Sequence, residues 1–335
     1  MKWKFYSLAF VAGMSILTAC SSDDNNDNDG NGGNGNGNEI ENGTILKGTI
    51  TSDVTLAAGN TYKLSGEYIV EEGATLHIEE GAKIIAVFDD IADYILVKQG
   101  GKINAVGTPD KPIVMTSEKE EPGAWGGIHI CGRAHTNAEG GKGSSEIGGA
   151  VYGGNDDADN SGTLQYIRLE YTGFAFDEEH EANGISFYGV GNGTIVDHCQ
   201  AYKGSDDGFE FFGGSVNVSN LVAVSCSDDS FDWTEGWNGK GTNLVAYQEA
   251  ESTLGYDCDC LMECDNNGSN NAATPVAHPV LKNLILVGNG GSKQGIRLRA
   301  GTEVEIATAE LCGTGRPQTV GTARTERALK TGTSQ

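Results

Sequence analysis

Residues 204–212 read GSDDGFEFF, and residues 226–234 read CSDDSFDWT, the same pattern one repeat later. The segments that follow also match, because Asn220-Leu-Val-Ala recurs as Asn243-Leu-Val-Ala. A short repeat of alternating apolar and polar residues is typical of one coil of a β-solenoid. Equivalent residues of successive coils then lie above one another, so we expect carboxylates to stack on carboxylates.

Apolar positions can be aligned through the coils in the same register. Because side chains alternate between the two faces of a strand, residues two apart share the core face. One expected pair of core ladders is Ile167, Cys199, Leu221, Leu244, Leu284 and Leu169, Ala201, Ala223, Ala246, Leu286. A second strand per coil is expected to bury Ile185 and Phe187, Phe209 and Phe211, Phe231 and Trp233, Met262 and Cys264, and Ile296 and Leu298.

Asparagine precedes the first ladder in three coils, at positions 220, 243 and 283. Stacked side-chain amides can hydrogen-bond to one another along the axis of a parallel stack. The sequence therefore predicts an asparagine ladder. Alternating strands and glycine turns extend the solenoid toward the N-terminus through residues 72–85, 101–108 and 125–130.

The N-terminal residues have the features of an export signal. Lys2 and Lys4 precede a short apolar run that ends in Leu17-Thr-Ala-Cys20, which is similar to the lipobox of bacterial lipoproteins. We expect residues 1–19 to be a signal peptide, Cys20 to carry lipid, and residues 20–38 to form an acidic, Asn/Gly-rich tether. The alternative is an ordinary signal peptide with a cysteine in it by chance.

The rest of the chain divides into a body, an insertion and a tail. Residues 39–306 are expected to form the solenoid, and residues 133–162, rich in Gly, Asn and Asp, to leave it as a long loop. From residue 307 the repeat pattern fades and Arg and Lys replace the acids, so residues 307–335 are expected to be an atypical or truncated tail. The formal charge of −25 argues against nucleic acid as a partner, because phosphates would be repelled.

Acidic residues form three columns on the predicted outer surface. Column 1 consists of Glu210, Asp232 and Glu263, each of which lies between two inward-facing residues of a strand. Column 2 contains Asp207 and Asp229, three positions earlier in their coils. Column 3 contains Asp206, Asp228 and Asp259, one position before column 2. Like charges one coil apart repel each other, so some of these carboxyl groups need a raised pKa or a cation. The columns supply eight candidate metal ligands: Asp206, Asp207, Glu210, Asp228, Asp229, Asp232, Asp259 and Glu263.

Calcium fits this donor set best, because it takes six to eight oxygen ligands, bidentate carboxylates among them. Paired carboxylates one or two coils apart would also suit glycoside hydrolysis. Lys203, Lys240 and Arg297 flank the patch and are candidate bases for a lyase. The alternative is that the acidic residues occupy solvent-exposed turns, where their side chains hydrogen-bond to their own backbone.

Aromatic and cationic side chains near the patch are candidate ligand-binding groups. Phe212, Trp237 and Tyr256 could stack on sugar rings, and Arg297 could bind a polar ligand. The alternative is that such aromatic residues pack under a loop or cover the edge of the solenoid.

Taken together, four segments resemble a group of surface lipoproteins, mainly from Bacteroidota, with right-handed parallel β-helix bodies of the pectate-lyase-like type. They are Trp125-Gly-Gly-Ile-His-Ile, the two Asp-Asp segments at 206 and 228, and His278-Pro-Val-Leu-Lys-Asn. The resemblance implies an all-β fold and an outer-membrane address, but no catalytic residues. We expect a lipid-anchored, surface-exposed protein that binds calcium and a polysaccharide or surface protein. The alternatives are a polysaccharide lyase or hydrolase and a structural stalk or adhesin.

Overall fold

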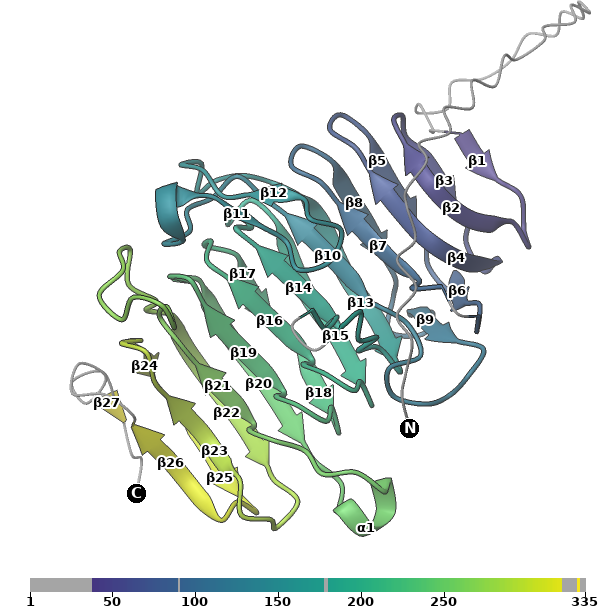
Figure 1. Cartoon of the computed structure of the whole chain (residues 1–335). Coiled ribbons are helices and arrows are strands. Elements are labelled where there is room, and N and C mark those ends of the chain that lie inside the picture. The colour runs from purple at the N-terminus through teal and green to yellow at the C-terminus, as the bar shows by residue number, and fades with distance from the viewer. Residues whose placement is uncertain (1–37, 90, 178–179, 321–329, 332–335) are drawn as a thin grey trace, which may run out of the picture. The chain divides into compact units, whose positions relative to one another are not determined.

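The computed structural model describes residues 38–89, 91–177, 180–320 and 330–331. The predicted signal peptide, Cys20 and the tether up to residue 37 lie outside the described residues, whereas Asn38, the last residue of the predicted tether, begins a strand. Within them, 25 strands pair into one network in which every pairing is parallel. The fold is an all-β parallel β-helix, as predicted (Figure 1).

The strands stack in three ladders, which we call faces A, B and C. Face A carries the acidic columns. It consists of the ends of β2 (Ile45–Ile50) and β4 (Thr61–Val70), then β7 (Tyr94–Val97), β10 (Ile128–Cys131), β14 (Ile185–Tyr188), β16 (Phe209–Phe212), β19 (Phe231–Thr234), β21 (Met262–Cys264), β23 (Gln294–Leu298) and β26 (Arg316–Val320).

Faces B and C share several long strands, which bend from one face into the other. Face B consists of β1 (Asn38–Ile40), β3 (Val54–Leu56), β5 (Thr75–Ile78), β8 (Lys102–Val106), the starts of β13 (Gly162–Glu170) and β15 (Ile195–Tyr202), β17 (Asn217–Ser219), the starts of β20 (Lys240–Tyr247) and β22 (Val280–Val287), β24 (Glu305–Ile306) and β27 (Lys330–Thr331). Face C adds β6 (Lys83–Ala86), β9 (Ile113–Ser117), β18 (Val222–Val224) and β25 (Ala309–Cys312) to the remaining halves of the long strands.

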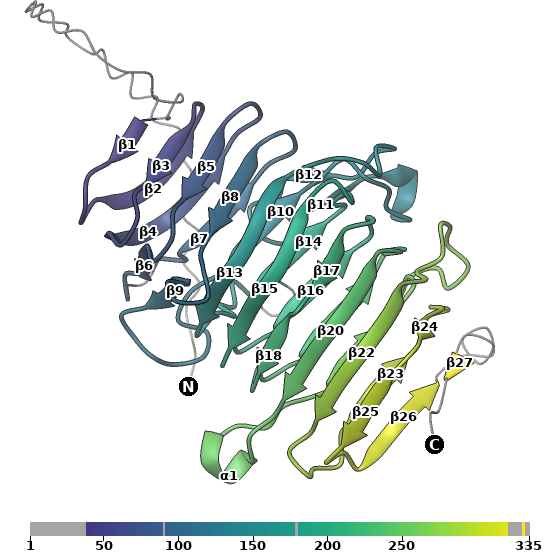
Figure 2. The ribbon, with the colours of Figure 1, turned by 180° about the vertical axis from the view of Figure 1, so that it is seen from behind.

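The bend between faces B and C is where the predicted asparagine ladder lies. Asn220, Asn243 and Asn283 all have positive φ, which asparagine tolerates better than most residues. Asn243 Nδ2 donates to Asn220 Oδ1 at 2.8 Å, and Asn283 Nδ2 donates to Asn243 Oδ1 at 3.0 Å. The ladder is confirmed, and it fixes the same corner in successive coils. Figure 2 shows the long strands that share this corner, β15, β20 and β22, following one another along the stack.

The predicted core register is confirmed as well. Leu221 aligns with Leu244, and Leu244 pairs with Leu284; all three are at most 2% exposed. On face A the inward aromatic rings stack from coil to coil, with ring centroids 5.0 Å apart for Phe187 and Phe211. Apolar burial along the whole solenoid is therefore the main source of its stability.

The insertion does leave the stack, but it has structure of its own. Between β10 and β13 the chain forms a short 3₁₀ turn (Glu139–Gly141) and an antiparallel pair, β11 (Gly143–Ser144) and β12 (Val151–Tyr152). Its apolar side chains pack with outward residues of face A in a second buried cluster, which includes Tyr94, Ile147, Tyr152, Tyr188 and Phe212. The insertion thus covers part of the face that carries the acids.

Strand pairing continues beyond residue 306, where the sequence pattern led us to expect a tail. β25 pairs with β22, and β26 pairs with β23. Parallel pairing uses backbone groups, so it continues after the side-chain repeat has faded. The described residues contain one α-helix, α1 (Glu251–Leu254), and no helix among them is long and apolar enough to span a membrane.

Candidate functional site

Column 1 forms on the outer surface of face A as expected. Glu210 of β16 pairs with Asp232 of β19, and Asp232 pairs with Glu263 of β21. Neighbouring parallel strands lie about 4.8 Å apart. Ser186 precedes this row of three carboxylates and Arg297 follows it.

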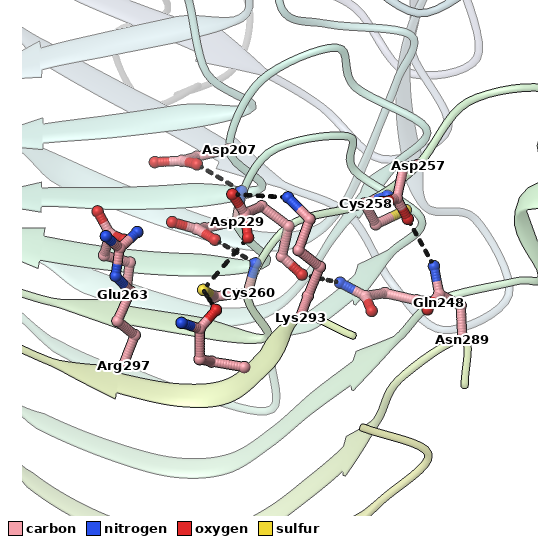
Figure 3. A network of polar contacts seen from close by, with 12 residues as sticks. Asp207, Asp229, Gln248, Asp257, Cys258, Cys260, Glu263, Asn289, Lys293 and Arg297 are labelled. Atoms are coloured by element: carbon pink, nitrogen blue, oxygen red, sulfur yellow. Dashed lines mark hydrogen bonds and ion pairs between the residues drawn. The ribbon is translucent and has the colours of Figure 1, made fainter. Parts of the chain in front are cut away.

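Column 2 lies in the turn before face A and forms a hydrogen-bonded ladder. The backbone N–H of Asp207 donates to Asn183 Oδ1 at 3.2 Å. That of Asp229 donates to Asp207 Oδ1 at 2.8 Å, and that of Cys260 to Asp229 Oδ1 at 2.6 Å (Figure 3). One oxygen of each carboxylate therefore connects two coils. These bonds join neighbouring coils, whereas the alternative of solvated turns expects each acid to bond its own backbone.

The side chains of Asp207 and Asp229 in column 2 are shielded from water. Asp207 is 5% exposed and Asp229 is 4% exposed. Burial raises the pKa of Asp207, Glu210, Asp229 and Asp232 well above the usual range, and repulsion from neighbouring carboxylates adds to the rise. These groups need either protons or a cation near neutral pH.

Column 3 extends the patch at its edge. Burial, followed by repulsion from Asp228, raises the pKa of Asp206 to about 8. Asp228 itself is exposed, yet its carboxyl pKa is also raised by burial of the group and by Asp259. Asp206 and Asp228 therefore share the electrostatic strain of Asp207 and Asp229.

Several carboxylates are close enough to share one ion. One set is Asp207, Glu210 and Asp232, and another is Asp229, Asp232 and Glu263; in each set one ligand atom per residue lies within 4.8 Å of the others. Asp232 belongs to both sets, and its Oδ1 is buried without a hydrogen-bond partner among the described residues. A carboxylate oxygen that is buried and unpaired costs free energy unless a ligand reaches it.

The far end of the patch is neutralised by the protein itself. Arg297 Nη1 lies 2.6 Å from Glu263 Oε1, and Arg299 pairs with both Glu263 and Asp265. Lys293 Nζ lies 3.2 Å from Asp259 Oδ2 (Figure 3). The predicted eight-carboxylate set therefore divides in two. Asp259 and Glu263 have cationic partners, and the described residues supply no ion pair to Asp206, Asp207, Glu210, Asp228, Asp229 or Asp232.

The insertion adds acids that sequence reasoning missed. Burial raises the pKa of Glu146 to about 7, and its charge in turn raises the pKa of Glu210. Tyr188 Oη donates to Glu146 Oε2 at 3.5 Å. Glu146 lies in a Gly/Ser-rich stretch outside the repeat, so no sequence pattern indicates that it returns to face A.

The aromatic side chains proposed to stack on sugars are structural instead. Trp237 is 1% exposed; its ring stacks on Phe211 at 4.1 Å, and its Nε1 donates to Val216 O at 3.2 Å. The turn after β19 carries it into the core, so it is not a ligand-binding surface. Phe212 stacks on Tyr188 at 4.3 Å beneath the insertion.

Tyr256 and the candidate bases are also occupied within the protein. Tyr256 Oη donates to Ser225 O at 2.7 Å, and Lys203 Nζ lies 3.2 Å from Glu249 Oε2. Arg297 Nη1 donates to Glu263 Oε1 at 2.6 Å. Lys240 lies on face B, away from the acids. Two of the three side chains proposed as the base of a lyase, Lys203 and Arg297, thus already have partners within the protein.

Comparisons with known proteins concern the fold. The sequence matches the family model described as "Pectate-lyase like beta helix domain" over residues 48–335. No curated protein matches the chain. A similar solved structure is the catalytic domain of a GH87 alpha-1,3-glucanase in complex with tetrasaccharides, at 10% sequence identity and a TM-score of 0.28. The similarity covers 83% of this chain and 64% of that one, which is less than two thirds of its length.

Proposed function

This chain belongs to the pectate-lyase-like β-helix family, and on that basis we propose that it is a carbohydrate-binding surface protein whose acidic face holds calcium. In this proposal Cys20 carries lipid in the outer membrane, and the acidic tether presents the β-helix to the cell exterior. A surface protein is the other partner that such an exposed β-helix could bind.

One observation carries the calcium proposal. Asp207, Glu210, Asp229 and Asp232 face one another on adjacent coils without a cationic side chain paired to any of them within the described residues. Asp232 Oδ1 has no hydrogen-bond partner there. Calcium coordinates oxygens at 2.3–2.6 Å and accepts irregular geometry, so it suits carboxylates whose spacing is set by the coils.

Calorimetric titration of the EDTA-treated chain with calcium and with magnesium tests this proposal. We expect saturable calcium binding and weaker magnesium binding, because magnesium requires near-octahedral geometry and gives up its water reluctantly. The variant Glu210→Gln, Asp232→Asn should lose the calcium heat. Absence of calcium binding by the unaltered chain would contradict the proposal.

The proposal that the protein binds carbohydrate rests on family membership and on the outer face of the β-helix. Members of the matched family are described as pectate-lyase-like, which indicates polysaccharides as the ligand class. A panel of oligosaccharides tested by calorimetry or glycan array would examine it. Failure of every glycan to bind would leave the stalk or adhesin as the better account.

A hydrolase at the same face is the second candidate, and Glu146 is the observation that favours it. A buried carboxyl group with a pKa of about 7 is suited to act as a general acid near neutral pH. The charge of Glu146 raises the pKa of Glu210, which would be the second carboxylate. Release of reducing ends from polysaccharides, abolished by Glu146→Gln, would support catalysis; activity retained in that variant would exclude this acid.

A further inference from the structure

A polar groove lies on the outer side of the solenoid at the end of β19. It has a volume of about 700 Å³ and is lined by the insertion, by the last residue of β19 and the residue after it, and by the loop that follows β21. The insertion and that loop lie at the same end of the strands (Figure 1). Sites for small ligands usually have about 300–1,000 Å³, so the groove is large enough for several sugar units.

The walls of this groove are held together by a buried amide network. Asn137 Nδ2 donates to Asn266 Oδ1 at 2.8 Å and to Pro275 O at 3.0 Å, and Asn267 Nδ2 donates to Asn137 Oδ1 at 3.0 Å. Asn137 is 8% exposed and Asn266 is fully buried. Because these amides are fixed before any ligand arrives, binding requires little further ordering of the walls.

The groove lining consists of amide, hydroxyl and carboxylate groups. Asn267, Ser269 and Asn270 lie on one side and Thr234 and Glu235 on the other. Amides and hydroxyls both donate and accept hydrogen bonds, as sugar hydroxyls do. Glu235 Oε2 accepts hydrogen bonds from Thr136 Oγ1 and Tyr152 Oη, both at 2.7 Å, while Oε1 forms none with the residues that the structure describes. Oε1 is therefore free to accept from a ligand hydroxyl.

The charge of the groove selects among polysaccharides. Glu139 and Glu235 line it, and none of its lining residues is Lys or Arg. A polymer of uronic acids would place carboxylates beside these two, which is unfavourable. We infer that the groove between the insertion and the loop after β21 binds an uncharged polysaccharide chain and disfavours polyuronates. This inference rests on the proposed carbohydrate function and assigns it a site and a ligand class.

Calorimetry with matched oligosaccharides in EDTA tests the inference, since EDTA prevents calcium from bridging anionic sugars to the protein. The probes are cellohexaose, xylohexaose, mannohexaose and hexagalacturonate. We expect at least one uncharged hexasaccharide to bind about 10-fold more tightly than hexagalacturonate. Tighter binding of hexagalacturonate would overturn the ligand class.

Gly268 offers a way to block the groove without disturbing the fold. It lines the groove, a Cβ added there would meet no atom within 4 Å, and its φ is not in the left-handed region. Gly268→Leu should weaken binding of the uncharged hexasaccharide by about 10-fold or more. Ser52→Leu, an exposed turn position in an N-terminal coil, is the matched control and should leave binding unchanged.

A second variant tests the charge argument directly. Glu139 is exposed, so Glu139→Lys should fold normally and raise the affinity for hexagalacturonate about 2–5-fold. Glycan binding that persists unchanged in Gly268→Leu would overturn the groove assignment while leaving the proposed function intact. Failure of all four probes, and of a wider glycan panel, would overturn both.

Discussion

Asp207 Oδ1 accepts the backbone N–H of Asp229, its counterpart in the next coil, at 2.8 Å. The two oxygens of each carboxylate in this column thus have different roles. One oxygen joins consecutive coils, and the other is left to the shared acidic patch. The stacking of coils and the accumulation of negative charge are therefore properties of the same side chains.

Asp207 can be used to separate these two roles. An asparagine already occupies the equivalent position one coil earlier, where Asn183 Oδ1 accepts the N–H of Asp207. Asp207→Asn should keep the coil-to-coil bond, remove a buried charge, and leave the unfolding free energy in EDTA unchanged or higher. Asp207→Ala should lower it by about 1–3 kcal/mol, because a buried N–H loses its acceptor. Equal urea unfolding curves for the two variants would contradict this division.

The pH dependence of the metal-free protein follows from the raised pKa values. A carboxyl group whose pKa is higher in the folded state holds its proton there more tightly than in the unfolded chain. Stability then falls as pH rises from the unfolded pKa near 4 to the folded pKa, which is about 7 for Glu146 and about 8 for Asp206.

We therefore expect the EDTA-treated protein to melt at a higher temperature at pH 5 than at pH 8. Asp206→Asn should reduce this difference, because one of the groups responsible no longer titrates. A melting temperature that rises steadily from pH 5 to pH 8 in EDTA would show that the acids are not strained.

The core register predicts the effect of a cavity. Leu221 is fully buried between neighbouring coils. Leu221→Ala should reduce the unfolding free energy by about 2–5 kcal/mol. Val222→Ala is the matched control, since Val222 is the next residue, the first of β18, and is partly exposed; it should cost far less. Chemical denaturation measures both, and similar losses would contradict the inward placement of Leu221.

Localisation can be tested independently of the fold. Cys20→Ala should release the protein from the membrane fraction, because lipid can no longer be attached. Replacing Asp23, Asp24 and Asp27 by Ala should keep the protein in the membrane but remove it from the cell surface. Protease treatment of whole cells reads out the second change, and unaltered cleavage would argue against the surface assignment.

Much of the fold could be predicted from the sequence, because the repeat places equivalent residues one above another. Leu244 and Asn243 show this: once the repeat is aligned, their neighbours in adjacent coils are determined, and the structure has them there. The end of the repeat was harder to locate. Pairing of β25 and β26 uses backbone groups, which leave no periodic signal in side-chain types.

The candidate site was less predictable where residues outside the repeat contribute. Arg299 neutralises Glu263 and Asp265, but it lies two residues beyond the aligned column. Glu146 reaches the acidic face only because the insertion folds back on it. Trp237 was misassigned as a ligand-binding residue because aromatic composition does not reveal which way a turn carries the ring.

We propose that the carboxylates on face A that have no cationic partner among the described residues form a calcium site. The most direct test of this claim is the melting temperature of the unaltered protein at neutral pH in calcium and in EDTA. Because the site exists only in the folded chain, bound calcium should raise the melting temperature, and more so than magnesium. In the Glu210→Gln, Asp232→Asn variant the calcium effect should vanish, with the metal-free form at least as stable as the unaltered protein. Identical melting curves for the unaltered protein in calcium and EDTA would contradict the claim and identify the patch as a solvated acidic face.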